Sequence, residues 1–186
     1  NRGIDRAAKG VERATMRDIK HAKYCVKMDI HKFYPSIPHD KLKEHLQRKI
    51  KDKKALGIIH LVIDSYHSSP GHGIPIGNYT SLWLAEFYLQ SLDYFIKQTL
   101  DIRYYVRYAD DLVLIDNNKR KLRKAMYAVM EFVGKLGLGI KHDYQLFRIQ
   151  RNCKSRKHRR GRKIDFVGRC FGIRTTTIRK RRALAL

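Results

Sequence analysis

The 186 residues of this chain suffice for one domain with a sizeable core and are too few for two comfortable ones. Its 41 Lys and Arg against 17 Asp and Glu give a formal net charge of +24, an excess that repels itself in a compact fold unless a polyanion neutralises it. Nucleic acid is therefore the first partner to consider, and an anionic membrane surface the second. The sequence has no run of about 18 apolar residues and no signal-like stretch, so we expect a soluble, cytoplasmic protein without a membrane partner. Three cysteines without Cys-x-x-Cys spacing argue against a disulfide framework and a zinc site.

The first part of the chain predicts helices around one early strand. Residues 1–23 are basic with scattered apolar positions and predict a helix after an irregular start. Residues 24–30 predict a short strand that ends on the acid Asp29, and residues 33–35 predict a bend. Pro38 fits the first position of the next helix, whose apolar residues recur at every fourth position.

The second part predicts a strand hairpin with an acidic tip between two helices. Residues 104–106 and 112–115 are rich in strand-forming residues and flank the turn Tyr108–Asp111. The other predicted elements are helices over 55–66, 78–97 and 121–136, a loop over 68–73, a basic loop over 151–163 and a hairpin over 164–178. The order of these elements indicates an α+β fold in which helices cover one face of an antiparallel sheet.

Three carboxylates suggest a metal site. Asp29 ends one predicted strand, and Asp110 and Asp111 lie at the tip of the hairpin. If these strands are neighbours in one sheet, the carboxylates converge, and hard oxygen ligands of this kind select Mg²⁺. Two such ions can activate a hydroxyl and stabilise a leaving group. An acidic pair at a turn is, however, more often solvated turn chemistry when it stands alone.

Three segments carry a resemblance to a known family. Asp29–Ile37, Gly73–Ser81 and Tyr105–Asp111 resemble, in the right order and with family-like separations, the first, second and third catalytic motifs of reverse transcriptases. Ile76 stands where most of these enzymes carry Gln, and with the downstream pattern it makes the chain most similar to diversity-generating retroelement enzymes, within the group II intron-like superfamily. The resemblance extends over about residues 1–182.

The resemblance implies a right-hand polymerase palm with partial fingers and the start of a thumb. The layout would be a finger-side helical segment over 1–23, a palm over 24–182 with a helical insertion over 39–72 and a primer-grip hairpin over 164–178, and a tail over 183–186. Finger strands upstream and a full thumb downstream are not visible in the sequence, so whether this piece is active alone stays open.

The resemblance also implies a metal site. Asp29 and Asp110 would be the primary ligands of two Mg²⁺ ions, for which Mn²⁺ could substitute. Asp111 would support them, and the backbone of Ile30 would add a carbonyl oxygen. Lys141 is a candidate general acid, although a solvated lysine is the commoner case near the start of a strand.

Four residues are implied to face the incoming nucleotide. Tyr34, with Phe33 beside it, would lie under the sugar and exclude a 2′-hydroxyl, and Gly77 would let the backbone approach the base pair closely. Ile76 would pack where Gln normally forms a hydrogen bond, which fits the error-prone copying of diversity-generating enzymes. The alternatives are a half-buried core aromatic for Tyr34 and a neutral apolar replacement for Ile76.

A basic tract near the C-terminus is implied to contact the template and primer. The predicted primer grip is Phe166, Val167, Gly168 and Arg169, and the predicted backbone contacts are Arg156, Lys157, Arg159, Arg160, Arg162 and Lys163. Such a tract neutralises phosphates through counterion release, and it would recognise an A-form hybrid by shape. A solvated loop is the alternative.

The function implied is that of an RNA-directed DNA polymerase, a nucleotidyltransferase, encoded by a bacterial or phage retroelement. Its partners would be an RNA template, a DNA or RNA primer and dNTPs, with an accessory protein as a further candidate. The alternatives are a group II intron-like or abortive-infection-type polymerase and a nucleic-acid-binding relative without catalysis. Intact acids at all three positions argue against the last of these.

Overall fold

The computed structural model describes residues 2–151 and 161–179. Its helices are α1 (Arg2–Glu12), α2 (Phe33–Ser36), α3 (His39–Lys49), α4 (Lys53–Asp64), α5 (Tyr79–Tyr88), α6 (Gln90–Tyr94) and α7 (Lys119–Lys135), with π-helical segments η1 (Arg13–Arg17) and η2 (Phe95–Thr99). Its strands are β1 (Tyr24–Asp29), β2 (Tyr104–Tyr108), β3 (Asp111–Asp116), β4 (Gln145–Arg148), β5 (Ile164–Phe166), β6 (Arg169–Gly172) and β7 (Thr175–Ile178).

The central sheet has the strand order β2-β3-β1-β4, and all three pairings are antiparallel. β1 and β3 form the middle of the sheet, and their register pairs Tyr24 with Asp116 at one end and Asp29 with Asp111 at the other. Successive side chains of a strand point to opposite faces, so each face has its own apolar set. The fold class predicted from the sequence, an antiparallel sheet with helices, is confirmed.

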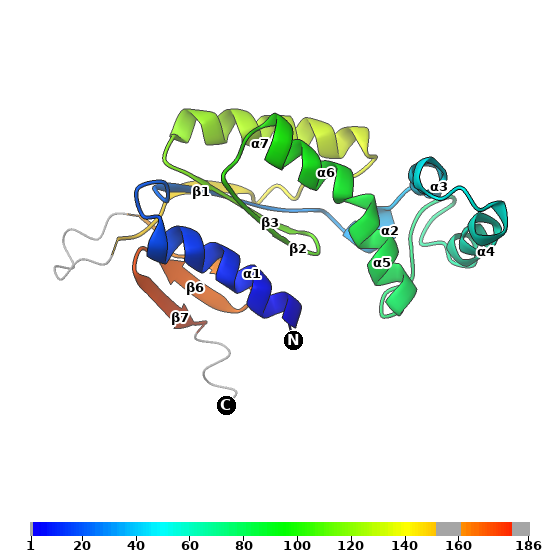
Figure 1. Cartoon of the computed structure of the whole chain (residues 1–186), viewed down its shortest axis with the longest axis horizontal. Coiled ribbons are helices and arrows are strands. Elements are labelled where there is room, and N and C mark those ends of the chain that lie inside the picture. The colour runs from blue at the N-terminus through cyan, green and yellow to red at the C-terminus, as the bar shows by residue number, and fades with distance from the viewer. Residues whose placement is uncertain (1, 152–160, 180–186) are drawn as a thin grey trace.

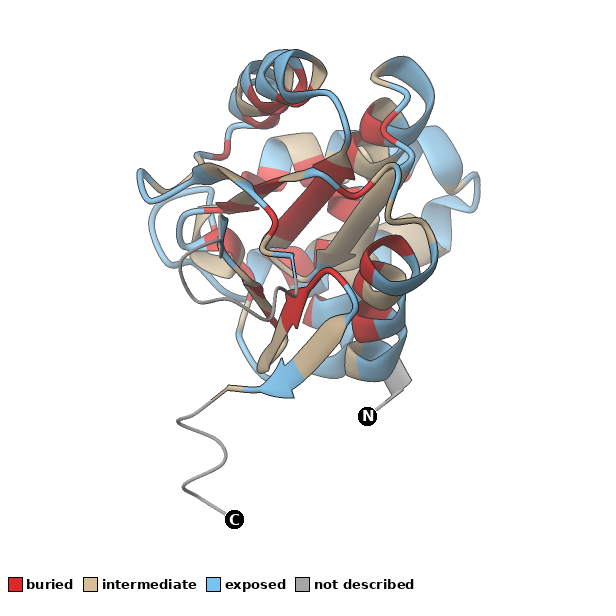
Figure 2. Ribbon diagram, turned by 90° about the vertical axis from the view of Figure 1, so that its left-hand side faces the viewer, coloured by how far each residue is buried: buried red, intermediate tan, exposed pale blue. Residues whose placement is uncertain are grey.

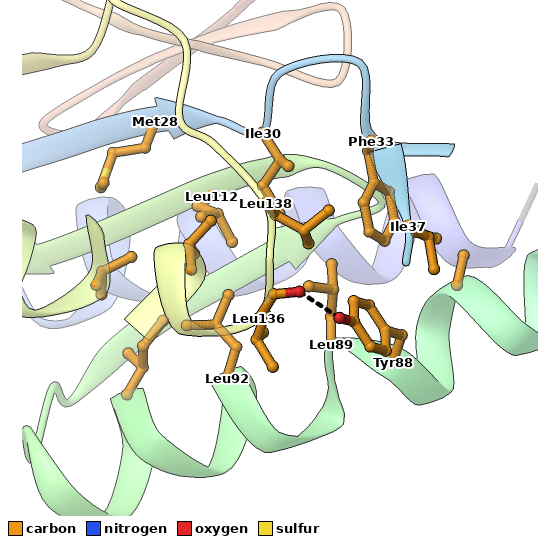
Figure 3. Close-up of a cluster of buried hydrophobic side chains, with 14 of the residues drawn as sticks. Met28, Ile30, Phe33, Ile37, Tyr88, Leu89, Leu92, Leu112, Leu136 and Leu138 are labelled. Carbon is orange, nitrogen blue, oxygen red and sulfur yellow. Dashed lines mark hydrogen bonds between the residues drawn. The ribbon is translucent and has the colours of Figure 1, made fainter. Parts of the chain in front are cut away.

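The first core lies between the sheet and helices α5, α6 and α7, which run along the same face (Figure 1). Figure 3 shows Met28, Leu112 and Leu92 meeting there, together with the ring of Tyr88. The hydroxyl of Tyr88 donates a hydrogen bond to the carbonyl oxygen of Leu136 and so ties α5 to the end of α7. Each fully buried side chain of this size contributes about 1.5–3 kcal/mol of transfer free energy.

The second core lies on the opposite face, where α1 packs across β2 and a three-stranded sheet of order β5-β6-β7 lies beside it (Figure 1). α1 carries small residues on this side, and a Cβ on Gly10 would lie 2.7 Å from Val106 Cγ2, so the helix approaches β2 closely because Gly10 lacks one. Figure 2 shows buried residues on the inward sides of the helices and along the sheet. Helices α5, α6 and α7 therefore cover one face of the central sheet, and α1 with the small sheet covers the other face.

Several predicted boundaries are corrected. The first helix begins at Arg2 without an irregular start and ends in η1, the bend after β1 is the short helix α2, and Pro38 precedes α3 as its N-cap residue. The single helix predicted over 78–97 is interrupted at Leu89, whose ψ of −1° ends α5. Neither Gly nor Pro marks this break in the sequence, so apolar periodicity could not detect it.

The predicted hairpin over 164–178 is a three-stranded sheet. Its second turn places Arg174 at φ 59°. An arginine in the left-handed region gives no turn signal of the kind that Gly or Asn gives. None of the described helices has the length and apolarity needed to cross a membrane.

Candidate active site

The pairing of β1 with β3 brings the predicted carboxylates together. Asp29 lies opposite Asp111 in the register, and the backbone N–H of Ile30 donates a 3.1 Å hydrogen bond to the carbonyl oxygen of Asp110. The hairpin β2–β3 turns through Ala109 and Asp110, so all three acids lie at one end of the two central strands. Asp111 is the first residue of β3 and lies in the sheet, whereas Asp110 lies in the turn.

The turn itself is strained. Ala109 has φ 51°, a left-handed conformation that costs a residue with a Cβ about 1–2 kcal/mol. Such a conformation persists only where the surrounding structure enforces it, and strain of this kind gathers at functional sites. The turn therefore needs contacts that hold it in place, and Arg107 provides one to the carbonyl oxygen of Ala109.

The acids repel one another and are partly removed from water. Burial raises the pKa of Asp110, and the neighbouring charge of Asp29 raises it further. Burial also raises the pKa of Asp111, against the effect of Lys27, whose Nζ lies 3.8 Å from Asp111 Oδ1. Because both carboxyls resist carrying their charge, a cation bound between them would stabilise this end of the sheet.

Lys141 forms an ion pair with the carboxylate of Asp29 and donates its backbone N–H to the carbonyl oxygen of Asp29 over 2.8 Å. The Asp29 carboxylate is the main cause of the raised pKa of Lys141. Within the described residues, the buried Oδ1 of Asp29 has no hydrogen-bond donor of good geometry. The ammonium group of Lys141 thus lies beside an oxygen that a metal ion could bind.

The residues present fit a metal ion whose coordination shell the substrate completes. Within residues 2–151 and 161–179, no group of three or more His, Cys, Asp or Glu side chains is placed to hold a metal by itself. Mg²⁺ is usually held by one or two carboxylates together with waters and substrate phosphates. Asp29, Asp110 and the carbonyl of Ile30 match that donor set, provided that Lys141 releases Asp29.

Tyr34 lies in α2, five residues after Asp29. Burial raises the pKa of Tyr34, and the negative charges of Glu86 and Asp110 raise it further. The ring of Phe33 meets the ring of Tyr34 edge-on with 5.4 Å between centroids, and Phe33 is buried in the first core. The ring of Phe33 therefore packs inside the protein and supports Tyr34, and the contact between Phe33 and a nucleotide stays a prediction.

The other two predicted nucleotide residues are accessible. Ile76 is 73% exposed. Gly77 has φ 97°, and a Cβ placed there would meet no atom within 4 Å, so the backbone at Gly77 faces open space. The N–H of Ile74 donates to the carbonyl oxygen of Tyr34 over 3.1 Å, which fixes this segment against α2.

A cluster around the buried side chain of Arg107 anchors the turn at Ala109, and sequence reasoning missed it. Arg107 is 8% exposed, and its Nε and Nη2 donate to the two carboxylate oxygens of Asp93 over 2.8 and 2.6 Å. Its Nη2 also lies 2.9 Å from Glu86 Oε2, and its Nη1 donates to the carbonyl oxygen of Ala109 over 3.2 Å. Tyr105 donates to Asp93 over 2.6 Å. One guanidinium group therefore connects α5 and α6 to the strained turn.

The four predicted primer-grip residues fall into two groups, two whose side chains pack or pair within the protein and two that form a partly accessible turn. Phe166 is buried in the second core, and Arg169 pairs with Asp5 and Glu12 of α1 at 3.0 and 3.9 Å, so these two side chains serve the fold. The turn at Val167 and Gly168 remains accessible in part.

Arg179 holds the turn at Val167 and Gly168. Arg179 donates its N–H to the carbonyl oxygen of Gly168 over 3.1 Å. The Asp165 carboxylate, which pairs with the guanidinium, is the main cause of the raised pKa of Arg179.

Most of the predicted backbone contacts cannot be placed. Arg156, Lys157, Arg159 and Arg160 lie outside the described residues. Arg162 is exposed, and Lys163 Nζ donates to Thr177 Oγ1 over 3.1 Å.

Residues 2–155 match the family described as reverse transcriptase (RNA-dependent DNA polymerase). The chain belongs to the reverse transcriptase family. A curated relative, the "uncharacterized 91 kDa protein in cob intron" of Schizosaccharomyces pombe, is 32% identical over 91 residues, which is 46% of this chain and 11% of that protein. This yeast relative does not support the bacterial or phage origin expected from the sequence, and the comparisons do not test the resemblance to diversity-generating enzymes.

Solved structures show the same reverse transcriptase fold. Apo telomerase from Candida tropicalis, truncated from its C-terminal domain, matches with a TM-score of 0.63 and 17% identity over 94% of this chain and 39% of that chain. Telomerase from Candida tropicalis in complex with a TWJ fragment of telomeric RNA matches with a TM-score of 0.64 and 16% identity over 95% of this chain and 32% of that chain. This reverse transcriptase chain thus spans less than half of the length of each of these relatives.

Proposed function

We propose that the chain is the palm of an RNA-directed DNA polymerase, which adds dNTPs to the 3′-hydroxyl of a primer on an RNA template with two Mg²⁺ ions. The observation that carries the proposal is the register that sets Asp29 against Asp111, with Asp110 in the adjoining turn. Membership of the reverse transcriptase family supports it. The layout of finger-side segment, palm and primer grip given above belongs to the same proposal.

Asp29 and Asp110, with the carbonyl oxygen of Ile30, would hold the ions, and Asp111 would support them. When bound, the ions would activate the attacking hydroxyl and stabilise charge on the leaving pyrophosphate. The protein's own contribution is placement, because the carboxylates sit on rigid strands and the arginine cluster fixes the turn. Lys141, once displaced from Asp29, would remain beside the phosphates as a cation.

The nucleotide would lie between Tyr34 and the segment at Gly77. Tyr34 lies five residues after Asp29 and is only partly buried, so its ring could contact a sugar and exclude a 2′-hydroxyl. The open space at Gly77 would admit the base pair, and Ile76 would present an apolar surface to it. An apolar residue gives no hydrogen bond that fixes base-pair geometry, and this supports an error-prone enzyme of the diversity-generating type.

A second candidate is an intron-type reverse transcriptase. The yeast relative described as a protein in the cob intron favours it. Both candidates copy RNA, so they share the RNA template, the DNA or RNA primer and the dNTPs as proposed partners. An accessory protein and a retroelement context are proposed with the diversity-generating type.

Primer extension on matched RNA and DNA templates, with and without template, tests the proposal. We expect Mg²⁺-dependent extension on RNA, its loss in Asp110→Asn, and unchanged hybrid binding by that variant. Asp101→Asn is the matched control, because the Asp101 side chain is 91% exposed and Asp101 precedes β2 at the end opposite the turn. The same variants are made in the full protein if the chain needs its flanking regions. Full extension by Asp110→Asn would refute the metal site, and extension without a template would refute templated copying.

A further inference from the structure

We propose that a groove between α1–η1 and β7 binds the phosphate backbone of a nucleic-acid strand outside the catalytic centre. The α1–β7 groove has a volume of about 540 Å³ and is lined by Lys9, Glu12, Arg13, Met16, Arg17 and Thr176. The identity of the polymer rests on the proposed function, whereas the anion-binding character of the groove rests on the residues themselves.

One wall of the groove is a stripe of basic side chains. Arg6, Lys9, Arg13 and Arg17 are three or four residues apart, so they share one side of the helix, and all four are exposed. The last three line the groove, and Arg6 continues the stripe beyond it. The opposite side of the same helix carries the small residues that pack on the sheet. Cations held in a row on a rigid helix match the regular spacing of phosphates along a nucleic-acid strand.

The positive charge of this stripe is not neutralised by the protein. Nearby acids are paired elsewhere: Asp5 and Glu12 with Arg169, and Asp18 with Arg103 at 3.1 Å. Within residues 2–151 and 161–179, none of the four basic side chains of the stripe forms an ion pair. The rest of the sequence contains neither Asp nor Glu. A polyanion is therefore the partner that the charge requires.

The other wall supplies the hydroxyl of Thr176, and the turn before β7 brings a further cation near η1. Thr176 Oγ1 is buried and has no hydrogen-bond partner among the described residues. An unpaired hydroxyl of this kind is costly unless a ligand satisfies it, and Thr hydroxyls commonly donate to phosphate oxygens. Arg174 is exposed in the turn before β7, where its N–H donates to the carbonyl oxygen of Thr15 over 3.1 Å. Both walls thus present groups that bind phosphate.

The groove is displaced from the catalytic acids along β2. A Cβ on Gly3 would lie 3.8 Å from the ring of Tyr108, so the first turn of α1 is beside the catalytic turn. The far end of the helix reaches Tyr104, whose hydroxyl donates to Asp18 over 2.6 Å. Four residue steps of a strand span about 13 Å at roughly 3.3 Å each. Figure 1 shows α1 lying along β2, with β6 and β7 beside it. A strand held here would be anchored beside the reaction without taking part in it.

The test compares two double variants that remove the same charge. Arg13→Gln/Arg17→Gln changes the groove, and Arg123→Gln/Lys124→Gln changes exposed residues of α7, on the other side of the sheet. Equilibrium binding of an RNA–DNA hybrid is measured without dNTPs between about 50 and 200 mM salt. We expect the groove variant to bind at least about tenfold more weakly at the lower salt, and its slope of log K against log salt to fall by roughly one to two. The α7 variant should keep the wild-type slope.

The proposal would be overturned if the groove variant kept the wild-type salt slope. It would also be overturned if the α7 variant lost as much affinity and slope as the groove variant. Unchanged hybrid binding with loss of binding to polyglutamate would overturn it too, since the groove would then serve an acidic protein. Failure of the proposed function would give a different result: wild-type protein would bind the hybrid but would not extend the primer. With saturating hybrid, the groove variant should extend primers at the wild-type rate.

Thr176→Val supplies an independent reading of the groove. Loss of an unsatisfied hydroxyl should leave the urea midpoint unchanged or raise it, whereas affinity for the hybrid should fall severalfold. Equal affinity in Thr176→Val and wild type would remove Thr176 from the site.

Discussion

Replacing Arg107 with Met should destabilise the protein and slow its chemistry. The guanidinium donates to both oxygens of Asp93, pairs with Glu86 and donates to the carbonyl oxygen of Ala109. Met fills a similar volume but removes the guanidinium, so that Asp93 keeps, among the described residues, only the hydrogen bond from Tyr105 and the carbonyl oxygen of Ala109 loses its donor. The variant therefore tests whether this arginine holds the catalytic turn.

The expected loss follows from the burial of the cluster. Removing one partner of a fully buried ion pair costs about 3–5 kcal/mol. The side chains of Asp93 and Glu86 are 34% and 44% exposed, so water can partly replace the guanidinium, and we expect a loss of about 2–3 kcal/mol. Arg107→Lys keeps the charge without the two-pronged geometry and should lose about half as much.

Urea unfolding measures this loss, and a double-mutant cycle with Asp93→Asn should give a coupling energy above about 1 kcal/mol. Arg103→Met is the control, because Arg103 is 60% exposed in its pair with Asp18 and should cost no more than about 1 kcal/mol. In single-turnover extension, Arg107→Met should lose at least about tenfold in rate, or 1.4 kcal/mol, with hybrid affinity within about twofold of wild type.

Partial recovery of the rate by Arg107→Lys would show that the effect runs through the contacts of the guanidinium. Two results would refute the reasoning. One is an unfolding free energy for Arg107→Met equal to that of wild type. The other is an unchanged extension rate in a variant that is measurably less stable, since Arg107 would then support the fold without positioning the turn.

Three further predictions follow from the site and the core. Tyr34→Ala should raise ribonucleotide incorporation by roughly 10- to 100-fold relative to dNTP, and an unchanged ratio would remove Tyr34 as the sugar gate. Because burial raises the pKa of Asp110, its charge destabilises the folded state above that pKa and the penalty vanishes as pH falls below the unfolded value of about 3.9. Asp110→Asn should therefore raise the urea midpoint near pH 7 without Mg²⁺ and leave it unchanged near pH 3. Mg²⁺ should stabilise wild type more than this variant. Equal midpoints for wild type and variant at both pH values would contradict this prediction. Tyr88→Phe should lower the free energy of unfolding by about 1–2 kcal/mol with an unchanged m-value, because it leaves the carbonyl of Leu136 unpaired.

The convergence of the acids could be predicted because it depends on local patterns. A strand that ends on Asp29 and a hairpin that turns at Asp110 require only strand propensity and a tight turn. Their pairing in one sheet then follows from two apolar strands that must bury the same face. Phe33 shows where this reasoning stops, because a motif predicts that a residue is near the site and cannot say whether its ring faces the ligand or the core.

The arginine cluster and the α1–β7 groove could not be predicted in the same way. Arg107 is 14 residues from Asp93 in sequence, and their contact depends on how α6 crosses β2, which is a property of tertiary packing. The groove joins α1 to β7 across most of the chain, and the small sheet that forms its wall turns at Arg174 without a glycine. Long-range contacts between polar residues leave no periodic signal for sequence reasoning to find.

The two cations that touch the catalytic end of the sheet differ in how firmly they are held, and this difference suits their roles. Arg107 is almost fully buried and its contacts to Asp93 and Ala109 fix the backbone of the turn, which has to stay in place through every catalytic cycle. Lys141 is 40% exposed and pairs with Asp29 through a flexible side chain. A lysine can leave its partner at little cost when a divalent ion arrives, whereas a two-pronged arginine cannot. The carboxylate that we propose as a metal ligand is therefore paired with the exchangeable cation, and the strained turn with the permanent one.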